Sequence, residues 1–336
     1  MVNVIYIERE VLAHPRVFEI TGRFSGCAEV VCDRYTEIFN PKSQSFRLQK
    51  RNPALILALK QCGFVSQTPE GHGVGGEHNF YFSHMMNCLY DCRYCFLQGM
   101  YRSAHFVVFV NYEDFEDAIR GQAQTHAGPV WFFSGYDCDS LAYEPVTGFA
   151  KHFNPVFAEV ENAWLELRTK STQIRCLTGL PASDNIVVAF SFTPEPISNA
   201  FEHKVPSVAK RVEAMRELQK RGWRAGSRFD PMVHHPEFEA QYEELFSQIF
   251  SRIDLSAIHS VTLGAFRMPK TFYQNLVKHY PEEPLLAGPL GKTAGVISYT
   301  PGLERDIMAY CQDLLTRYVP DNVVHPYLLS CHGSAS

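Results

Sequence analysis

Segments rich in Val, Phe, Ile and Tyr alternate with amphipathic segments along most of the chain. The apolar segments are residues 79–84, 106–111, 129–135, 164–169, 186–192, 226–233 and 260–266. Their length and composition are typical of buried strands. Between them, apolar residues recur at spacings of three and four over 205–221 and 238–253, which predicts helices. Strands that alternate with helices indicate βαβ units and a parallel sheet, so the predicted fold class is α/β.

The two ends of the chain show a different pattern from the middle. Residues 1–78 combine a short strand at 4–8 with loops and one helical patch near 53–61. The tail is rich in Gly and Pro before a predicted helix near 303–318. We therefore expect an N-terminal cap and strand extension (1–78), a central α/β domain (79–280) and a C-terminal extension packed on it (281–336).

Composition and charge narrow the class of protein. Hydrophobic residues make up 46% of the 336 residues and charged residues 20%, which excludes a disordered chain. A net charge of −5 excludes a polycation built for non-specific nucleic-acid binding, but not a local basic face. No apolar run approaches the roughly 20 residues of a membrane helix, and the charged N-terminal segment does not resemble a signal peptide. We predict a cytoplasmic protein without membrane partners.

Three of the ten cysteines, Cys88, Cys92 and Cys95, are crowded together directly after the predicted strand at 79–84. Thiolates bind soft iron and zinc, and a compact loop can bring three of them to one site. Zinc requires a fourth ligand, which makes a Cys3His site with His84 an alternative. The usual structural zinc site has two separated pairs of ligands, however, and no second pair is present.

Three cysteines with uneven spacing instead favour a [4Fe–4S] cluster that leaves one iron open. An open iron can chelate the amino and carboxylate groups of S-adenosylmethionine. The spacing therefore predicts a radical S-adenosylmethionine site rather than a zinc site or a group of buried thiols without a metal.

Two further patterns are assigned structural roles. Residues 71–76 match GxGxxG, but a strand-like segment follows them where the dinucleotide-binding motif requires a helix, which indicates a loop. Basic residues gather over 204–228, mainly on the predicted helix, with Glu213 and Glu217 interleaved. This arrangement predicts a solvated helix face with i,i+4 ion pairs rather than a phosphate-binding stripe.

The cysteine motif and the Phe96-Leu97-Gln98 that follows it resemble the spore photoproduct lyase family of radical S-adenosylmethionine enzymes. The resemblance runs from about residue 4 to about residue 320. Outside the motif it rests on Val4–Glu8, Val107–Asn111, Arg168–Lys170, Ser191–Thr193, Phe201–Glu202, Ala209–Ala214, Gly222 and Asp230–Pro231.

This resemblance implies a partial (β/α)6 TIM-like barrel with capping segments at both ends and the cluster at the carboxyl ends of the strands. It implies that Tyr94, Lys170, Ser191 and Asp230 lie near S-adenosylmethionine, with Lys170 and Ser191 binding its carboxylate. The cofactor is cleaved by one electron to a 5′-deoxyadenosyl radical. The family's substrate is a methylene-bridged thymine dimer, so damaged DNA and a small electron donor of the flavodoxin or ferredoxin type are the implied partners.

The chain departs from the family's pattern where the reaction ends. Tyr136 stands in place of the hydrogen-donating cysteine, and Cys138 in place of a serine that touches the cofactor. Phe96 replaces a tyrosine that relays the radical, Asp230 adds a negative charge beside the cofactor, and Ser298 replaces a basic residue of the DNA-binding hairpin. We rank Cys138 and Tyr136 as joint candidates for the catalytic hydrogen donor. The alternatives are a radical enzyme with a non-DNA substrate and a non-catalytic iron–sulfur or zinc module.

Overall fold

A computed structural model describes residues 2–69 and 71–327 of the chain. Its larger sheet has eight strands in the order β18-β14-β13-β11-β10-β9-β5-β4. Every neighbouring pair in it is parallel except β4 and β5. The strands are β4 (Ser66–Gln67), β5 (His78–Phe82), β9 (Val130–Ser134), β10 (Ala163–Thr169), β11 (Ile186–Ser191), β13 (Arg224–Met232), β14 (Ile258–Ala265) and β18 (Val324–Tyr327).

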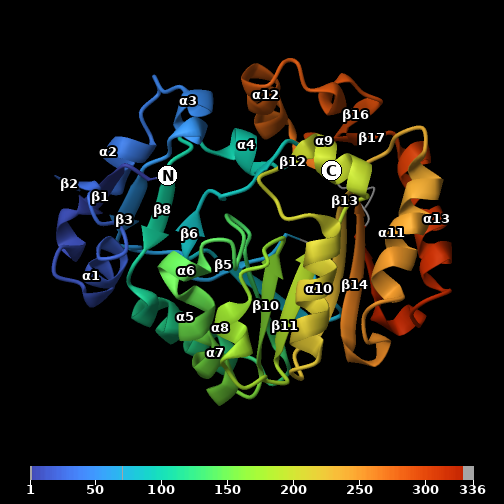
Figure 1. The fold of residues 1–336 in the computed structure, drawn as a ribbon, viewed down its shortest axis with the longest axis horizontal. Helices are drawn as coiled ribbons and strands as arrows, with labels where there is room; N and C mark the ends of the chain where they lie inside the picture. Colours follow the sequence, from blue (N-terminus) through green and yellow to red (C-terminus); the bar gives the residue numbers. More distant parts are fainter. Residues whose placement is uncertain (1, 70, 328–336) are drawn as a thin grey trace, which may run out of the picture.

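Helices lie along the outside of this curled sheet (Figure 1), among them α5 (Tyr112–Gln124), α7 (Phe149–Glu159), α10 (Val208–Gln219), α11 (Phe238–Phe250) and α13 (Pro301–Leu315). The helices α4 (Leu97–Met100), α9 (Glu195–Phe201) and α12 (Lys270–His279) lie instead at the upper end of the molecule in this view. The remaining helical segments are the short α6 (Glu144–Thr147) and α8 (Arg175–Thr178) and the 3-10 turns η2 (Leu255–Ala257), η3 (Pro284–Ala287) and η4 (Asp321–Val323). The strands β5, β9, β10, β11, β13 and β14 follow one another in chain order around the sheet. The predicted partial (β/α)6 barrel is therefore confirmed, and β18 extends it by one more parallel strand.

The alternation of side chains on the strands explains how the barrel is filled. Successive residues of a strand point to opposite faces. On β9, Phe132 belongs to the large apolar core shared with the helices. Its neighbours Trp131 and Phe133 form a separate cluster with Val187 of β11 on the other face. Both faces of the sheet are thus covered, which is typical of a parallel sheet.

A second sheet contains the N-terminal strands in the order β2-β1-β3-β8-β6. Its strands are β1 (Val4–Glu8), β2 (Ala28–Cys32), β3 (Leu55–Ala58), β6 (Met85–Met86) and β8 (Phe106–Phe109), and η1 (Arg9–Val11), α1 (Pro15–Thr21), α2 (Tyr35–Phe39) and α3 (Phe46–Arg51) accompany them. The predicted helical patch at 53–61 is wrong, because this segment contains the fully buried strand β3. A short apolar run covered on both faces forms a strand, and it lacks the polar positions of an amphipathic helix.

The strand predicted at 106–111 is present as β8, but it pairs with β3 and not with the barrel strands. The N-terminal sheet therefore includes residues from both sides of position 78, and the proposed division at 78 and 281 stays a prediction. The described part of the C-terminal extension contributes β16 (Leu290–Thr293) and β17 (Val296–Tyr299), which pair with each other, and β17 also pairs with β15 (Arg267–Pro269). Residues 328–336 lie outside the described residues.

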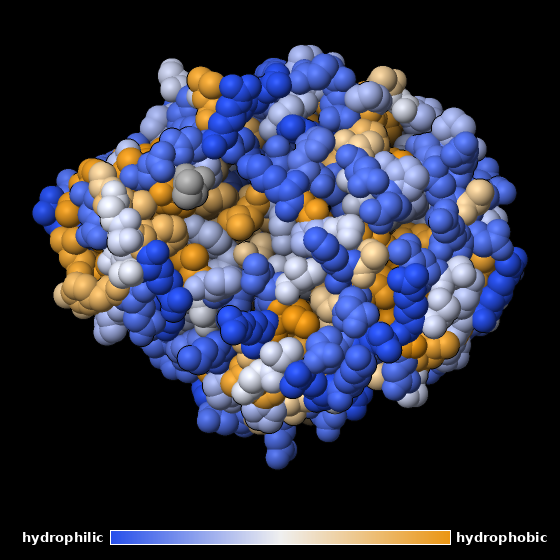
Figure 2. Space-filling model, viewed as in Figure 1, coloured by the Kyte–Doolittle hydropathy of each residue, from blue (hydrophilic) through white to orange (hydrophobic). Residues whose placement is uncertain are grey.

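On the face shown in Figure 2, hydrophilic residues predominate, and apolar residues gather at the end of the molecule where α1 and β2 lie. Exposed large apolar side chains in or beside these elements are Leu12, Phe18, Val30 and Val31. Across residues 2–69 and 71–327, none of the helices has the length and apolar character required to cross a membrane.

Candidate active site

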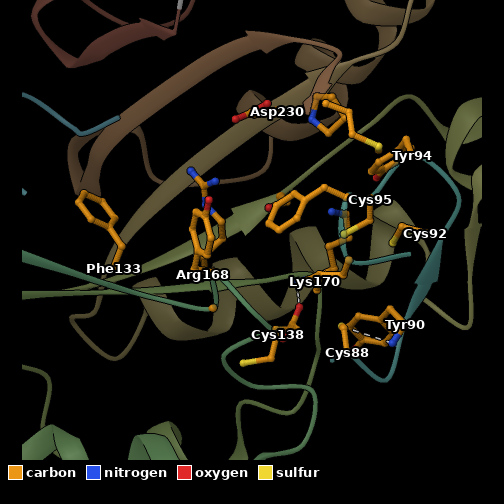
Figure 3. A pocket seen from close by; sticks show the side chains of 18 of the residues that line it. Cys88, Tyr90, Cys92, Tyr94, Cys95, Phe133, Cys138, Arg168, Lys170 and Asp230 are labelled. Atoms are coloured by element: carbon orange, nitrogen blue, oxygen red, sulfur yellow. Dashed lines mark hydrogen bonds between the residues drawn. The ribbon is translucent and has the colours of Figure 1, made fainter. Parts of the chain in front are cut away.

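A cavity of about 420 Å³ lies at the carboxyl ends of the barrel strands. Loops after β9 and β10 and the last residues of β11 and β13 line it, which is where α/β barrels place their sites. All nine side chains predicted from the sequence line this one cavity: Cys88, Cys92, Tyr94, Cys95, Tyr136, Cys138, Lys170, Ser191 and Asp230. Figure 3 shows the three cysteines on one side of the cavity and Phe133, Arg168 and Asp230 on the other.

The cysteine loop is anchored at two places. The short strand β7 (Asp91–Cys92) pairs antiparallel with β12 (Glu202–His203), which follows α9. The backbone N–H of Cys95 donates to the carbonyl of Cys92 at 3.0 Å, which closes a tight turn between them. From the N-terminal side, the buried Lys50 of α3 donates to the carbonyls of Cys88 at 3.4 Å and Tyr90 at 3.3 Å. The loop is thus held from one side by β12 and from the other by α3.

The described side chains do not assemble the Cys3His zinc site that the sequence left open. A zinc site with bonds of about 2.3 Å to sulfur needs its ligands in close contact around one point. Within the described part of the chain, no three His, Cys, Asp or Glu side chains converge in this way. His84, the fourth ligand of the zinc alternative, is buried elsewhere, with its ring stacked on Phe149 at 3.7 Å between centroids. Cys88, Cys92 and Cys95 nevertheless line one cavity, and three thiols of this kind can also bind a cluster in which each cysteine holds a different iron.

Burial raises the pKa of the cysteine thiols, to about 12 for Cys88. The effect is desolvation, which penalises the charged thiolate. Lys170 acts in the opposite direction on Cys92 and Cys95. These thiols are therefore protonated when no metal is bound, and a metal ion or cluster that they bind would replace their protons.

The buried carboxylate of Glu202 organises the side of the cavity next to the cysteines. It accepts hydrogen bonds from the hydroxyl of Tyr94, from Ser198 Oγ at 2.7 Å and from Arg211 Nη2 at 2.7 Å. Lys170 Nζ lies 3.9 Å from its Oε1. Burial alone would raise the pKa of Glu202, but the charges of Arg211 and Lys170 outweigh it and lower the pKa. Glu202 therefore stays ionised and orients both Tyr94 and Lys170.

The basic run at 204–228 is only partly the solvated face that we predicted. Arg216 and Arg221 form exposed i,i+3 and i,i+4 pairs with Glu213 and Glu217, as predicted. Arg211 is instead fully buried in the Glu202 network, so its assignment to the solvated face is wrong. The physical reason is that a buried carboxylate needs a partner charge, and α10 turns this position inward.

The loop after β9 carries Tyr136 and Cys138 and is held in a bent conformation. Gly135 has φ +85°, and a Cβ there would lie 2.7 Å from Ser140 Oγ, so glycine is required. Asp139 fastens the loop to β10, because its carboxylate accepts from Thr169 Oγ1 at 2.6 Å and from the N–H of Lys170 at 2.6 Å. The loop is therefore bent. On an extended strand Tyr136 and Cys138, two residues apart, would point to the same face, and here they do not have to.

Tyr136 and Cys138 accordingly contact different surroundings, although both line the cavity. The ring of Tyr136 stacks on Tyr81, with centroids 4.4 Å apart, and lies 5.4 Å from Phe96. Cys138 is buried and belongs to the apolar cluster of the N-terminal sheet, together with Met85. Burial raises the pKa of both groups, so both remain protonated and retain a hydrogen atom.

The wall opposite the cysteines contains ion pairs that the sequence analysis did not assign. Arg228 of β13 donates to both oxygens of Glu166 on β10, with Nη2–Oε2 at 2.7 Å and Nε–Oε1 at 3.3 Å. Arg267 forms a similar bidentate pair with Asp230, with both N–O distances at 3.1 Å. Asp230 is thus not the uncompensated negative charge expected from the sequence. Burial raises its pKa, but Arg267 reverses the effect and lowers it.

Two glycines make room for these pairs. A Cβ at Gly226 would lie 2.8 Å from Arg228 Nη1, and a Cβ at Gly264 would lie 2.8 Å from Arg267 Nη1. Each close approach therefore depends on the missing side chain. Glu166 and Arg168 are two residues apart on β10, as are Arg228 and Asp230 on β13. Side chains at this spacing on a strand point to the same face. Two charged residues at alternate positions of an otherwise apolar strand are therefore the sequence feature from which these ion pairs could have been predicted.

A partial barrel with three cysteines in a loop at the carboxyl ends of its strands defines the class of radical S-adenosylmethionine enzymes. The family model of spore photoproduct lyase matches residues 77–287. Spore photoproduct lyase of Bacillus subtilis (strain 168) is 22% identical over 84% of this chain and 83% of its own length. The enzyme of Clostridium acetobutylicum is 21% identical over 75% of both chains.

Solved structures share the fold over almost the whole chain. A doubly substituted spore photoproduct lyase with bound AdoMet and dinucleoside spore photoproduct superposes with a TM-score of 0.86 at 18% identity, covering 98% of this chain and 99% of the other. A spore photoproduct lyase complexed with dinucleoside spore photoproduct gives a TM-score of 0.82 at 17% identity and 98% coverage of both chains. The chain belongs to the spore photoproduct lyase family, as a divergent member, and is an enzyme of the radical lyase type.

Proposed function

We propose that this enzyme binds a [4Fe–4S] cluster through Cys88, Cys92 and Cys95 and acts on a pyrimidine lesion in DNA. The observation that carries the proposal is that these three thiols open into one cavity with Lys170 and Ser191. Family membership supports the same reading, because relatives with this fold have been solved with AdoMet and with dinucleoside spore photoproduct.

The residues of the cavity supply the cofactor site. When bound, the cluster supplies the electron that cleaves S-adenosylmethionine to methionine and a 5′-deoxyadenosyl radical. Lys170 donates a charge-assisted hydrogen bond to the methionine carboxylate, and Ser191 donates a second bond. Tyr94 and Asp230 complete the proposed contacts. Asp230 contributes as a hydrogen-bond acceptor, because Arg267 balances its charge.

Tyr136 and Cys138 are the proposed hydrogen donors at the end of the reaction. A thiol gives up its hydrogen atom more readily than a phenol, so the buried Cys138 is chemically suited to this step. Tyr136 occupies the position of the family's donor cysteine and stacks on Tyr81 at the cavity. The electron donor that we propose is a small protein of the flavodoxin or ferredoxin type in the cytoplasm.

One observation favours a second candidate, a radical enzyme with a small-molecule or peptide substrate. Ser298 stands where the family has a basic residue in its DNA-binding hairpin. It is buried on β17, and its hydroxyl donates to the carbonyl of Tyr299 at 3.2 Å. This position of the hairpin therefore offers no cation to a DNA phosphate.

The test is an anaerobic incubation of the reduced, iron-reconstituted protein with S-adenosylmethionine and ultraviolet-damaged DNA. The proposed function predicts 5′-deoxyadenosine together with repaired thymine, and neither product with the Cys92→Ala variant. Formation of 5′-deoxyadenosine without repaired thymine favours the non-DNA substrate. An absence of 5′-deoxyadenosine in a protein with full iron and sulfide content favours the non-catalytic module and contradicts both enzymatic proposals.

A further inference from the structure

Arg168 presents a guanidinium group to the cavity and contacts the ion pairs of the wall through its Nε alone. Its Nε lies 3.2 Å from Glu166 Oε1, and its side chain is 25% exposed. Among the described residues, its two terminal nitrogens have no hydrogen-bond or ion-pair partner. Figure 3 shows the guanidinium near Phe133 and Asp230, on the side of the cavity away from Cys88 and Cys92.

Both carboxylates of this wall are already engaged by other arginines. Glu166 is bound through both oxygens by the fully buried Arg228, and Asp230 through both oxygens by Arg267. Among the described residues, Arg168 therefore shares Glu166 with Arg228 and has no carboxylate of its own. The nearby His72 carries no charge at neutral pH, because burial and the charge of Arg168 lower its pKa to about 4.

A guanidinium held in a cavity with free terminal nitrogens is suited to binding an oxyanion through two parallel hydrogen bonds. The low dielectric of the cavity strengthens such a bond and makes an unpaired charge costly. Glu166 fixes the Nε end, so the fork is oriented before a ligand arrives. On the other side of the cavity, Lys170 already provides the positive charge proposed for the cofactor carboxylate.

We propose that Arg168 binds an oxyanion group of the substrate, a phosphate or a carboxylate, and so selects an anionic substrate. This inference rests on the proposed function, because it assigns the cavity to the substrate as well as to the cofactor. In a DNA lesion the oxyanion is the phosphodiester between the two damaged nucleosides. In a small-molecule substrate it is a free phosphate or carboxylate.

The experiment is calorimetric titration of the anaerobic, reconstituted protein in phosphate-free buffer. The probes are thymine-dimer photoproduct with its phosphodiester, the same photoproduct as a dinucleoside without phosphate, inorganic phosphate, and S-adenosylmethionine. The variants are Arg168→Gln, which removes the charge, and Arg168→Lys, which keeps the charge without the fork. The control is Arg224→Gln, which removes an arginine at the other end of β13 whose partner is the exposed Asp184.

We expect the parent to bind the phosphodiester photoproduct about tenfold or more tightly than the dinucleoside, the usual effect of one charge-assisted pair. Arg168→Gln removes this preference, Arg168→Lys restores part of it, and Arg224→Gln leaves it unchanged. If Arg168→Gln weakens the binding of inorganic phosphate alone, the result also supports the site and identifies a small-molecule oxyanion as its ligand.

Two results overturn the inference. One is equal affinity of the parent and Arg168→Gln for every phosphate probe. The other is a loss confined to S-adenosylmethionine, which assigns the guanidinium to the cofactor instead. Formation of 5′-deoxyadenosine is measured in the same samples. If either result is found and the enzyme still forms 5′-deoxyadenosine normally, only the oxyanion site is refuted and the proposed function stands.

Discussion

Arg228 and Glu166 form a bidentate ion pair inside the barrel, and both side chains are completely buried. Arg228 also donates to the carbonyl and to the hydroxyl of Ser260, each at 2.9 Å. Two strands that are separated by β11 are therefore joined through their side chains as well as through the backbone. Glu166 Oε1 also lies 3.2 Å from Nε of the cavity-lining Arg168, so the buried pair supports the cavity from the interior of the barrel.

Arg228→Met is expected to destabilise the protein by about 3–5 kcal/mol, because it removes the bidentate partner of the buried Glu166 and leaves only the single contact with Arg168 Nε. The double variant Arg228→Met with Glu166→Leu is expected to recover much of this loss. Urea unfolding measures both effects. The exposed pair Arg317 and Glu243 provides the control, since Arg317→Met removes a surface ion pair worth about 0–1 kcal/mol. Equal losses at the two arginines would contradict the prediction.

The same carboxylate predicts how stability depends on acid. Burial raises the pKa of Glu166, but the charges of Arg228 and Arg168 outweigh it and lower the pKa to about 2. The unfolded chain binds this proton at its ordinary pKa near 4.5. The stabilisation is therefore complete above pH 4.5 and is lost as the pH falls from 4.5 to about 2, with a size on the order of 3 kcal/mol. Unfolding at a series of pH values should show a flatter acid limb for Glu166→Gln, and an unchanged limb would refute this account.

Replacing any one of Cys88, Cys92 and Cys95 by Ala is expected to abolish cluster binding. The parent should bind about four irons and four sulfides per chain after reconstitution. Cys311→Ala is the matched control, because this buried thiol belongs to α13 and does not line the cavity. A stoichiometric zinc without sulfide in the parent would exclude the cluster.

Lys170→Ala is expected to weaken S-adenosylmethionine binding by about 1.5–3 kcal/mol while the iron content stays the same. The physical reason is the loss of one charge-assisted hydrogen bond to a carboxylate. Lys210→Ala, on the exposed side of α10, should leave the affinity unchanged. Equilibrium binding of the cofactor measures the difference. Equal affinities of Lys170→Ala and the parent would show that Lys170 serves Glu202 alone.

Cys138→Ala and Tyr136→Phe are expected to separate radical formation from product formation. Both variants should still form 5′-deoxyadenosine, because neither change touches the cysteine ligands. The variant that lacks the hydrogen donor should yield less product for each 5′-deoxyadenosine. The ratio of the two products is the measurement. If both variants keep the parental ratio, the terminal hydrogen comes from another group.

The parallel α/β sheet could be predicted from the sequence because its strands are apolar and separated by amphipathic helices, whereas the partial barrel followed from the family resemblance. The strand β3 was missed because a run of four buried residues contains no periodicity that distinguishes strand from helix. The hydrophobic pattern also could not predict that β8 belongs to the N-terminal sheet, because its pairing with residues 55–58 is set by the topology of the fold and not by the local sequence.

Only some of the residues that line the cavity could be predicted from the sequence. The cysteines stand out because they are close together in sequence, and the cofactor residues followed from the family resemblance. Ion pairs such as Glu166 with Arg228 connect residues that are 62 positions apart. Nothing local marks such partners, although charges in alternate positions of an apolar strand indicate that a polar interior exists.

The pairing of β8 with β3 limits where the chain can be truncated. The residues of β8, Phe106 to Phe109, are all buried, and β3 covers one of their backbone edges. A fragment that begins at the barrel would expose this flat, apolar edge to other chains, which is the geometry that nucleates intermolecular strand pairing and aggregation. The lyase barrel thus depends on the N-terminal strands as a protective partner during folding, and a soluble minimal enzyme must retain them.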